Sequence, residues 1–232
     1  DKDGPLCAEQ MLYAACFRVM AEISEQLGKD GSAYRQEYGK LTAAIEKFFW
    51  DEEKGAYVDS FTSGKRNVTR HANIFAILFD IADKQKQEKI LKNVLENDEI
   101  PAITTPYFNF FELDVLCQMG KLTEVLDKIR FYWGGMLDLG AVTFWEEYDP
   151  SVPKEEQYDM YGDHFGKSLC HAWAASPIYF LAKYFAGLDL VNKDGVTYVL
   201  KPQMQYFTDL DCTLPVGSDG TVRLAWDGEC LE

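Results

Sequence analysis

The chain has 232 residues, of which 47% are hydrophobic, so it is long enough to bury a core in one large domain or two small ones. Its 23 lysines and arginines stand against 38 acidic residues, a formal net charge of −15 that repels nucleic-acid phosphates and anionic membranes. No apolar run could span a bilayer, and the start DKDGPLCAEQ has neither an initiator Met nor the layout of a signal peptide. We therefore expect a soluble piece of a longer protein, with neither nucleic acid nor membrane as a partner.

Apolar residues recur at three- and four-residue steps along most of the first 190 residues, which is typical of amphipathic helices. The first helix is predicted over residues 6–27 and ends before Gly28. Further helices are predicted over residues 32–49, 69–81, 84–95, 107–119 and 123–132. Short polar or Gly/Pro loops join them, except that WDEEKGAYVDS reads as a turn that leads into a short extended piece.

A seventh helical pattern covers residues 167–185 and contains Pro177. The helix is either kinked at this proline or restarts there, with Ser176 as N-cap and Pro177 as first residue. After Gly187 the runs GVTYVLKP, DLDCTLPV and TVRLAW predict short strands, bounded by NKDG and GSDG turns. The chain is thus predicted to be mainly α, with a strand-rich tail.

Antiparallel helix pairs with short connections suggest an α/α toroid or a solenoid. No repeat of fixed period is visible, which favours the toroid over a tetratricopeptide or ankyrin array. The six cysteines are scattered without a CxxC pair, so we expect neither a zinc site nor a dense disulfide framework. Cys212 and Cys230 lie in the same strand-rich tail and could pair.

The connection over residues 136–166 is the longest irregular segment, and with the residues that follow it is the richest in chemistry. The segment from Thr143 to Trp173, both included, holds seven acidic and seven aromatic residues and begins with TFWEEYDP. Aromatic rings beside carboxylates suit a sugar, because the rings stack on its apolar face and the carboxylates accept from its hydroxyls. The alternative is a solvated acidic loop in which Trp145 only anchors the core.

Other chemical motifs are weak or missing. His71 is expected to serve packing or capping, and His171 is predicted in the first turn of its helix, near the mouth of a toroid. Three scattered histidines without H-x3-H spacing make no metal site. The sequence has no GxSxG, GxGxxG or Walker motif, which argues against a nucleophilic hydrolase and a dinucleotide-binding protein. No cofactor is expected.

The segments TFWEEYDP, HFGKSLCHAWAASPIYFLAKYFAGL and YVLKPQM resemble the C-terminal part of bacterial α-L-rhamnosidases, glycoside hydrolase family 78. The segments FFWDEEKGAYVDS, RHANIFAIL and TTPYFNFFELDVL are also similar to that family, so the resemblance covers nearly the whole chain. It implies an (α/α)6 barrel, of which residues 1–190 would be the second half. Residues 191–232 would then begin a β-sandwich.

The resemblance also implies an activity, the inverting hydrolysis of terminal α-L-rhamnose. It assigns the general base to Glu146 and contact with the sugar to His171, with Trp145 as a wall of the pocket. We expect Tyr107 to converge with Glu146 and His171 at one end of the toroid. The substrate would be a rhamnose-containing carbohydrate, and the compartment stays open between cytoplasm, periplasm and secretion.

One part of the family pattern is missing from this sequence. The family's general acid lies in an Arg-Asp-Glu-Arg type motif that has no counterpart here, so the isolated chain is expected to be inactive and to bind the missing half of the barrel or itself. Two alternatives stay open at this stage. One is another α/α-toroid glycosidase that acts on a different sugar, and the other is a carbohydrate-binding module without catalysis.

Overall fold

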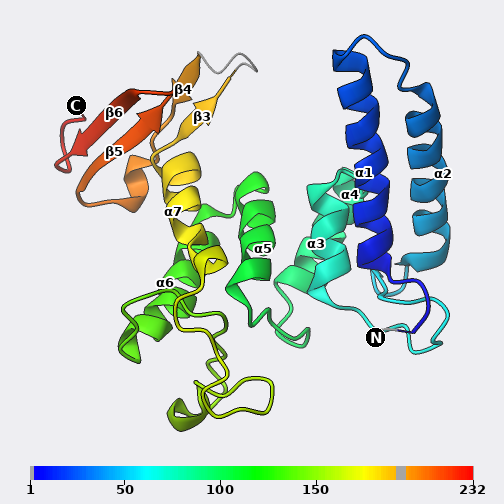
Figure 1. Ribbon diagram of the computed structural model, residues 1–232, viewed down its shortest axis with the longest axis horizontal. Helices are drawn as coiled ribbons and strands as arrows, with labels where there is room; N and C mark the ends of the chain where they lie inside the picture. The colour runs from blue at the N-terminus through cyan, green and yellow to red at the C-terminus, as the bar shows by residue number, and fades with distance from the viewer. Residues whose placement is uncertain (1–2, 192–196, 232) are drawn as a thin grey trace. The chain divides into compact units, whose positions relative to one another are not determined.

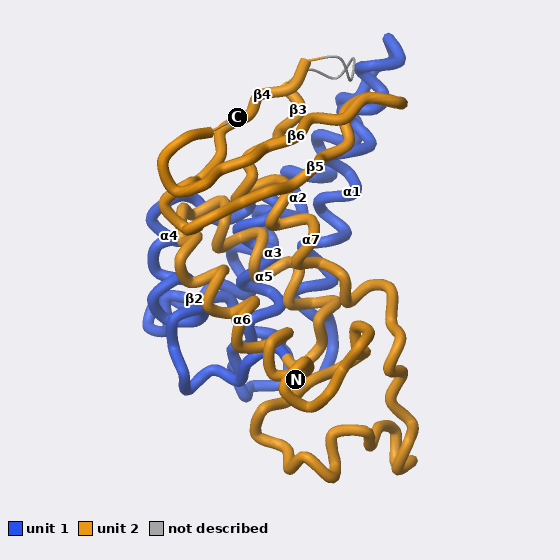
Figure 2. Tube along the Cα trace, turned by 90° about the vertical axis from the view of Figure 1, so that its left-hand side faces the viewer, with its two compact units in different colours: residues 1–103 blue, residues 104–232 orange. Residues whose placement is uncertain are grey.

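The computed structural model describes residues 3–191 and 197–231. It divides into two compact units, residues 1–103 and residues 104–232 (Figure 2). Helices dominate both units, and strands longer than three residues occur only in the tail among the described residues (Figure 1). The predicted mainly helical fold with a strand-rich tail is therefore confirmed. The NKDG turn lies outside the described residues.

The first unit contains two helical pairs. Helix α1 (Cys7–Gln26) and helix α2 (Ser32–Phe49) form the first pair, and α3 (Arg70–Leu78) precedes α4 (Lys84–Ile90), which continues as a π-helical turn over Leu91–Leu95. Gly31 lets α1 and α2 meet closely, because a Cβ there would lie 2.8 Å from the carbonyl oxygen of Ala21. The helices lie within the predicted ranges, although α3 is shorter at both ends.

Between α2 and α3, a short hairpin of β1 (Trp50–Asp51) and β2 (Ala56–Tyr57) is tied to α3 by one buried side chain. The amide of Asn73 accepts from the Tyr57 backbone N–H at 2.9 Å and donates to the Tyr57 carbonyl at 3.0 Å. It also donates to the carbonyl of Thr69. A buried amide with these partners satisfies backbone groups that would otherwise be costly to bury.

The second unit begins with α5 (Pro106–Gln118) and α6 (Leu122–Asp138). Residues 139–175 follow without an α-helix and include the 3₁₀ turns Lys154–Glu156 and Ala172–Ala174. Helix α7 (Ser176–Phe180) then continues as a π-helical turn over Leu181–Phe185. Helix α5 buries side chains around most of its circumference, which is typical of a helix enclosed by its neighbours.

The prediction of a helix over residues 167–185 is wrong for its first half. Two backbone groups of this segment bond to the preceding loop instead, since His171 N–H donates to Phe144 and the carbonyl of Ser168 accepts from Glu146. His171 therefore precedes a 3₁₀ turn and is not in the first turn of an α-helix. The restart at the proline is correct, but Ala175 is the N-cap, so Ser176 and Pro177 are the first two helical residues.

The strand-rich tail packs on the end of the last helix. Strands β3 (Leu188–Leu190) and β4 (Tyr198–Leu200) pair antiparallel, a 3₁₀ turn covers Met204–Tyr206, and β5 (Leu210–Val216) pairs with β6 (Gly220–Trp226). Leu214 and Leu224 of the β5–β6 hairpin bury against Ala186. All six cysteines are free thiols, so Cys212 and Cys230 do not pair here. A domain boundary after residue 190 stays a prediction.

Candidate active site

Two backbone hydrogen bonds bring the ends of the long 139–175 segment together. The N–H of His171 donates to Phe144 O at 2.8 Å, and the N–H of Glu146 donates to Ser168 O at 2.9 Å. The Thr143 hydroxyl adds a bond to the carbonyl of Leu169. These bonds place Glu146 and His171 side by side although a long loop separates them in sequence.

The Glu146 carboxylate lies among donors, and its side chain is 14% exposed. Its Oε2 accepts from the Ser168 backbone N–H at 3.1 Å and lies 3.9 Å from Nδ1 of His171. Its Oε1 accepts from the Tyr161 hydroxyl at 3.3 Å. The carboxylate is thus held in place, yet part of it remains accessible to a small molecule.

The side chain of the adjacent Glu147 makes a different contact. Its Oε1 accepts from the Thr104 hydroxyl at 2.9 Å, which ties the loop to the segment that precedes α5. Successive side chains on an extended backbone point to opposite sides. Glu147 thus points away from the Glu146 carboxylate, towards Thr104.

The two tryptophans of the site differ in exposure. Trp145 is 3% exposed and packs edge-on against Tyr158, with ring centroids 5.6 Å apart. Trp173 is 54% exposed, and its ring lies 4.3 Å from that of His171 and 5.1 Å from that of Tyr107. The structure thus connects Tyr107 to His171 through Trp173, and it buries Trp145 in the core, as the alternative reading of the loop expects.

Two neighbours of the site received no role from sequence reasoning, Trp173 and Tyr161. Both were visible only as members of an aromatic-rich segment. Gly162 alone signals a turn and does not place the Tyr161 side chain, and Trp173 follows His171 by two residues. His71 lies in the first turn of α3, in the other unit.

The acidic loop contains one buried cation. Lys167 is 8% exposed, and burial lowers the pKa of its ammonium group. The negative charges of Glu147, Asp149, Asp159 and Glu146 act in the opposite direction. Close to the carboxylate pair, the charge of Glu146 raises the pKa of the Tyr161 hydroxyl. Both Lys167 and Tyr161 therefore lie in the field of the carboxylates of this segment.

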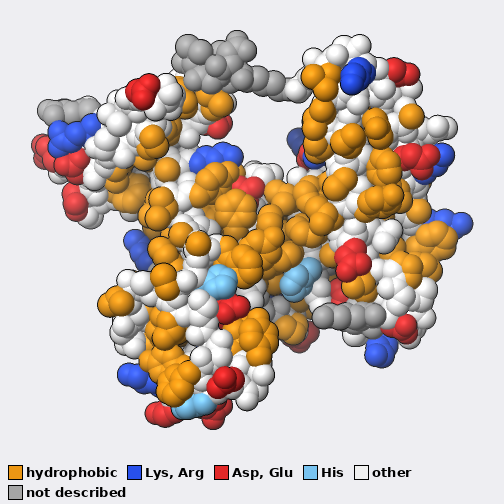
Figure 3. Space-filling model, viewed as in Figure 1, with side chains coloured by type: hydrophobic (Ala, Val, Ile, Leu, Met, Phe, Trp, Pro, Cys, Tyr) orange, Lys and Arg blue, Asp and Glu red, His pale blue; other side chains and the backbone are white. Residues whose placement is uncertain are grey.

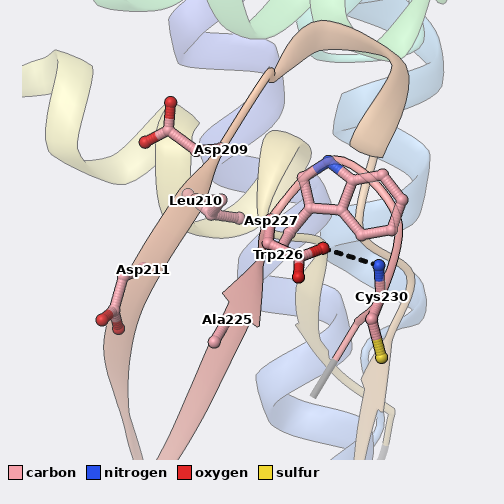
Figure 4. Close-up of a pocket in the computed structure, with 7 residues that line it drawn as sticks. All are labelled: Asp209, Leu210, Asp211, Ala225, Trp226, Asp227 and Cys230. Atoms are coloured by element: carbon pink, nitrogen blue, oxygen red, sulfur yellow. Dashed lines mark hydrogen bonds between the residues drawn. The ribbon is translucent and has the colours of Figure 1, made fainter.

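A hollow lined in part by acidic residues, with a volume of about 260 Å³, lies on the tail beside Trp226 (Figure 4). Its carboxylates have local structural roles. Asp227 accepts from the backbone N–H of Cys230 at 2.8 Å, and Asp211 forms an ion pair with Arg223 at 2.7 Å. In this hollow the acids stabilise turns and strands, so we place the candidate active site at Glu146.

Within residues 3–191 and 197–231, no three His, Cys, Asp or Glu side chains are arranged to hold a metal ion. In the same ranges, no helix combines the length and the apolar character needed to cross a bilayer.

A carboxylate beside a histidine and exposed aromatic rings, on antiparallel helical pairs, fits the class of α/α-toroid glycosidases. Residues 2–185 match the family model for the bacterial alpha-L-rhamnosidase 6 hairpin glycosidase domain, and the chain belongs to this family. No curated protein matches the sequence.

Solved structures agree with this assignment. A rhamnosidase from Klebsiella oxytoca with rhamnose bound is 30% identical, with a TM-score of 0.66 over 77% of this chain. A GH78 family rhamnosidase of Bacillus sp. GL1 is 24% identical, with a TM-score of 0.82 over 96% of this chain. The α-L-rhamnosidase of Streptomyces avermitilis, complexed with L-rhamnose, is 17% identical, with a TM-score of 0.71 over 94%. The chain spans only 34%, 24% and 20% of these three structures.

Proposed function

We propose that the protein containing this chain hydrolyses terminal α-L-rhamnosides with inversion, and that Glu146 is its general base. The observation that carries the proposal is the Glu146 carboxylate, held by Ser168 and beside His171, in a family of rhamnosidases. The Klebsiella oxytoca structure, which has rhamnose bound, supports L-rhamnose as the sugar.

In the proposed reaction, a water molecule lies between Glu146 and the anomeric carbon. Its oxygen bonds to that carbon while the bond from the carbon to the leaving oxygen breaks. One proton of the water passes to the Glu146 carboxylate, and a second carboxyl group donates a proton to the leaving oxygen. We assign this general acid to a part of the protein outside these 232 residues, and we expect the isolated chain to be inactive.

The remaining site residues bind the sugar in this proposal. His171 holds a hydroxyl through its imidazole, and Tyr107 contributes an aromatic wall together with Trp173, whose ring contacts both. Trp145 supports the pocket from behind, because its burial leaves little ring surface for a ligand. Thus Trp173, rather than Trp145, offers the tryptophan face.

The test compares Glu146→Gln with Glu147→Gln in the full-length protein, assayed with an aryl α-L-rhamnoside. Glu146→Gln keeps the shape but removes the base, so kcat should fall by roughly 10²–10⁴-fold while rhamnose binding survives. Glu147→Gln loses only the acceptor for Thr104, and its kcat should stay close to that of the wild type. Inversion is read directly from the anomer released, by NMR of the early product.

A reversed ranking of the two glutamates would assign the base to Glu147. Full activity in both variants would mean that this loop is a solvated surface and that Glu146 has no catalytic role. His171→Ala supplies an independent measurement, because losing a hydrogen bond to a sugar hydroxyl should raise KM roughly tenfold with a smaller effect on kcat.

A further inference from the structure

Tyr161 lies in a tight turn whose backbone conformation is unfavourable for a tyrosine. Met160 and Asp163 bond to each other through both backbone N–H groups, each at 3.0 Å, and the two residues between them have φ of +55° and +82°. Two-residue turns with two positive φ angles favour Asn or Gly, and a bulky side chain at positive φ costs about 1–2 kcal/mol. Gly162 meets the requirement of the turn, whereas Tyr161 does not.

The side chain of Tyr161 is not used for packing. It is 84% exposed, which leaves most of the ring in solvent. Its hydroxyl nevertheless reaches back to Oε1 of Glu146 at 3.3 Å. A strained backbone at the tip of a loop whose side chain contacts a candidate catalytic group points to a role for that side chain.

The two oxygens of Glu146 have unequal surroundings. Oε2 accepts from the fixed backbone N–H of Ser168 and faces His171. Oε1 accepts from the hydroxyl of the exposed Tyr161 side chain. A carboxylate oxygen has two lone pairs, so Oε1 can accept from Tyr161 and from a water molecule at the same time.

We propose that Tyr161 is a positioning residue for the base: its hydroxyl fixes Oε1 of Glu146 so that the free lone pair of this oxygen faces the attacking water. The inference rests on the proposed function of Glu146 and names the oxygen that receives the proton. The carboxylate then has a donor on each oxygen, so rotation about its last bond is restrained before substrate binds.

The kinetic test uses three variants of the full-length protein. Tyr161→Phe keeps the ring and the turn but removes the donor, and losing one hydrogen bond to a charged group should lower kcat about tenfold with KM within about twofold. Tyr161→Asn removes the hydroxyl and is too short to reach Glu146 in its place, but it relieves the turn. Its kcat should therefore fall equally while its melting temperature is no lower than that of the wild type. Tyr158→Phe, which removes a hydroxyl from the same loop, is the matched control and should keep wild-type kcat.

Wild-type kcat in Tyr161→Phe would overturn the proposal. A lower kcat in Tyr161→Asn alone would also do so, because it would assign the effect to the ring and not to the hydroxyl. An equal fall of kcat in Tyr158→Phe and Tyr161→Phe would also contradict the proposal, because losing any hydroxyl from this loop would then have the same effect.

A second measurement needs no activity. Tyrosine labelled with ¹³C at the ζ carbon reports its own ionisation by NMR, and Tyr161→Phe identifies the Tyr161 signal in the full-length protein. The charges of Glu146 and, more weakly, Glu147 raise the pKa of Tyr161, so its titration midpoint should fall in Glu146→Gln and fall less in Glu147→Gln. An unchanged midpoint in Glu146→Gln contradicts the contact itself. If wild-type protein hydrolyses no rhamnoside while the midpoint moves, the proposed function fails and the contact stands.

Discussion

At the scale of single residues, Trp145 and Trp173 differ in burial, and this difference separates a packing role from a binding role that the sequence alone does not distinguish. Both lie in the aromatic-rich segment, and the family resemblance pointed to Trp145 because it precedes Glu146. In the structure Trp145 is buried against Tyr158, whereas Trp173 presents its ring beside His171. We therefore expect Trp145 to act on stability and Trp173 to act on binding.

Truncating each tryptophan should separate these roles. Trp145→Ala should destabilise the fold by about 3–5 kcal/mol, the usual cost of removing a large buried aromatic ring. Trp173→Ala should change the free energy of unfolding by less than about 1 kcal/mol, yet raise KM for an aryl α-L-rhamnoside. Urea unfolding followed by circular dichroism measures the first effect, and steady-state kinetics on the full-length protein measures the second. A large loss of stability in Trp173→Ala would assign it to the core instead.

The sequence predicted Glu146 and His171 because both belong to recognisable segments, TFWE and SLCHAW. It assigned no role to Tyr161 or Trp173, because each depends on where a non-helical backbone points a side chain. The reach of Tyr161 to Glu146 depends on a turn that is unfavourable for a tyrosine. Local propensity argues against such a placement, so only the folded loop reveals it.

At the scale of elements, α6 extends beyond its predicted end at residue 132, through Gly134 and Gly135 to Asp138. Glycine disfavours a helix interior, but the packing of this turn outweighs that preference. Trp133 and Met136 are buried, and the indole of Trp133 donates to the carbonyl of Ala174 at 2.8 Å. The last helix, in contrast, begins later than predicted, because backbone groups of residues 167–171 bond to the preceding loop instead.

The two glycines of α6 give opposite predictions for the same substitution. A Cβ on Gly135 would lie 2.4 Å from the hydroxyl and 2.6 Å from Cζ of Tyr148, whereas a Cβ on Gly134 meets nothing within 4 Å. Gly135→Ala should destabilise the protein by about 1–3 kcal/mol through overpacking. Gly134→Ala should stabilise it by about 0.5–1 kcal/mol, because alanine favours a helix interior.

Thermal unfolding of both variants measures the contrast, and each variant serves as the control of the other. Gly135→Ala as stable as Gly134→Ala would mean that the ring of Tyr148 does not lie against α6. The ring matters for the site, because Tyr148 follows the two glutamates directly. The Tyr148 backbone N–H donates to the carbonyl of Thr104 at 3.1 Å and to the Tyr132 hydroxyl at 3.1 Å, so the backbone at this position is held firmly.

At the scale of the whole molecule, hydrophobic side chains remain exposed along α1 (Figure 3). They include Leu12, Tyr13, Val19, Met20 and Ile23. Contiguous apolar surface of this kind is uncommon on monomers and favours association. This chain matches only about a fifth to a third of each solved rhamnosidase, so much of their structure has no counterpart here.

The isolated chain should therefore self-associate or be only marginally stable. Ile23→Lys should shift it towards monomer, because a charge on the apolar surface of α1 opposes burial of that surface. Gln26→Lys adds the same charge to an exposed polar position of the same helix and should leave association unchanged. Sedimentation velocity across a concentration series measures both. A monodisperse wild-type monomer with a high melting temperature would contradict the prediction.

The order of helices and the strand-rich tail could be predicted because both follow from local periodicity and turn residues. The division of the chain after residue 103 had no such signal. The loop there is not richer in Gly, Pro or Ser than others, and the boundary depends on which helices pack together. The tail packs on the last helix through Ala186, Leu214 and Leu224. The change in composition after Gly187 therefore marks the step from helices to strands, but it is not a boundary between compact units.

The hydrogen bonds that join Phe144 to His171 and Glu146 to Ser168 also bear on how this loop can vary. They close the loop at its base, so residues 150–156 can be lengthened or exchanged without moving Glu146 relative to His171. Each doubling of a flexible loop adds only about 0.6 kcal/mol of closure entropy. Segments grafted into this stretch could thus change the surroundings of Glu146 while its carboxylate stays beside His171, which makes residues 150–156 the natural insertion point for engineering.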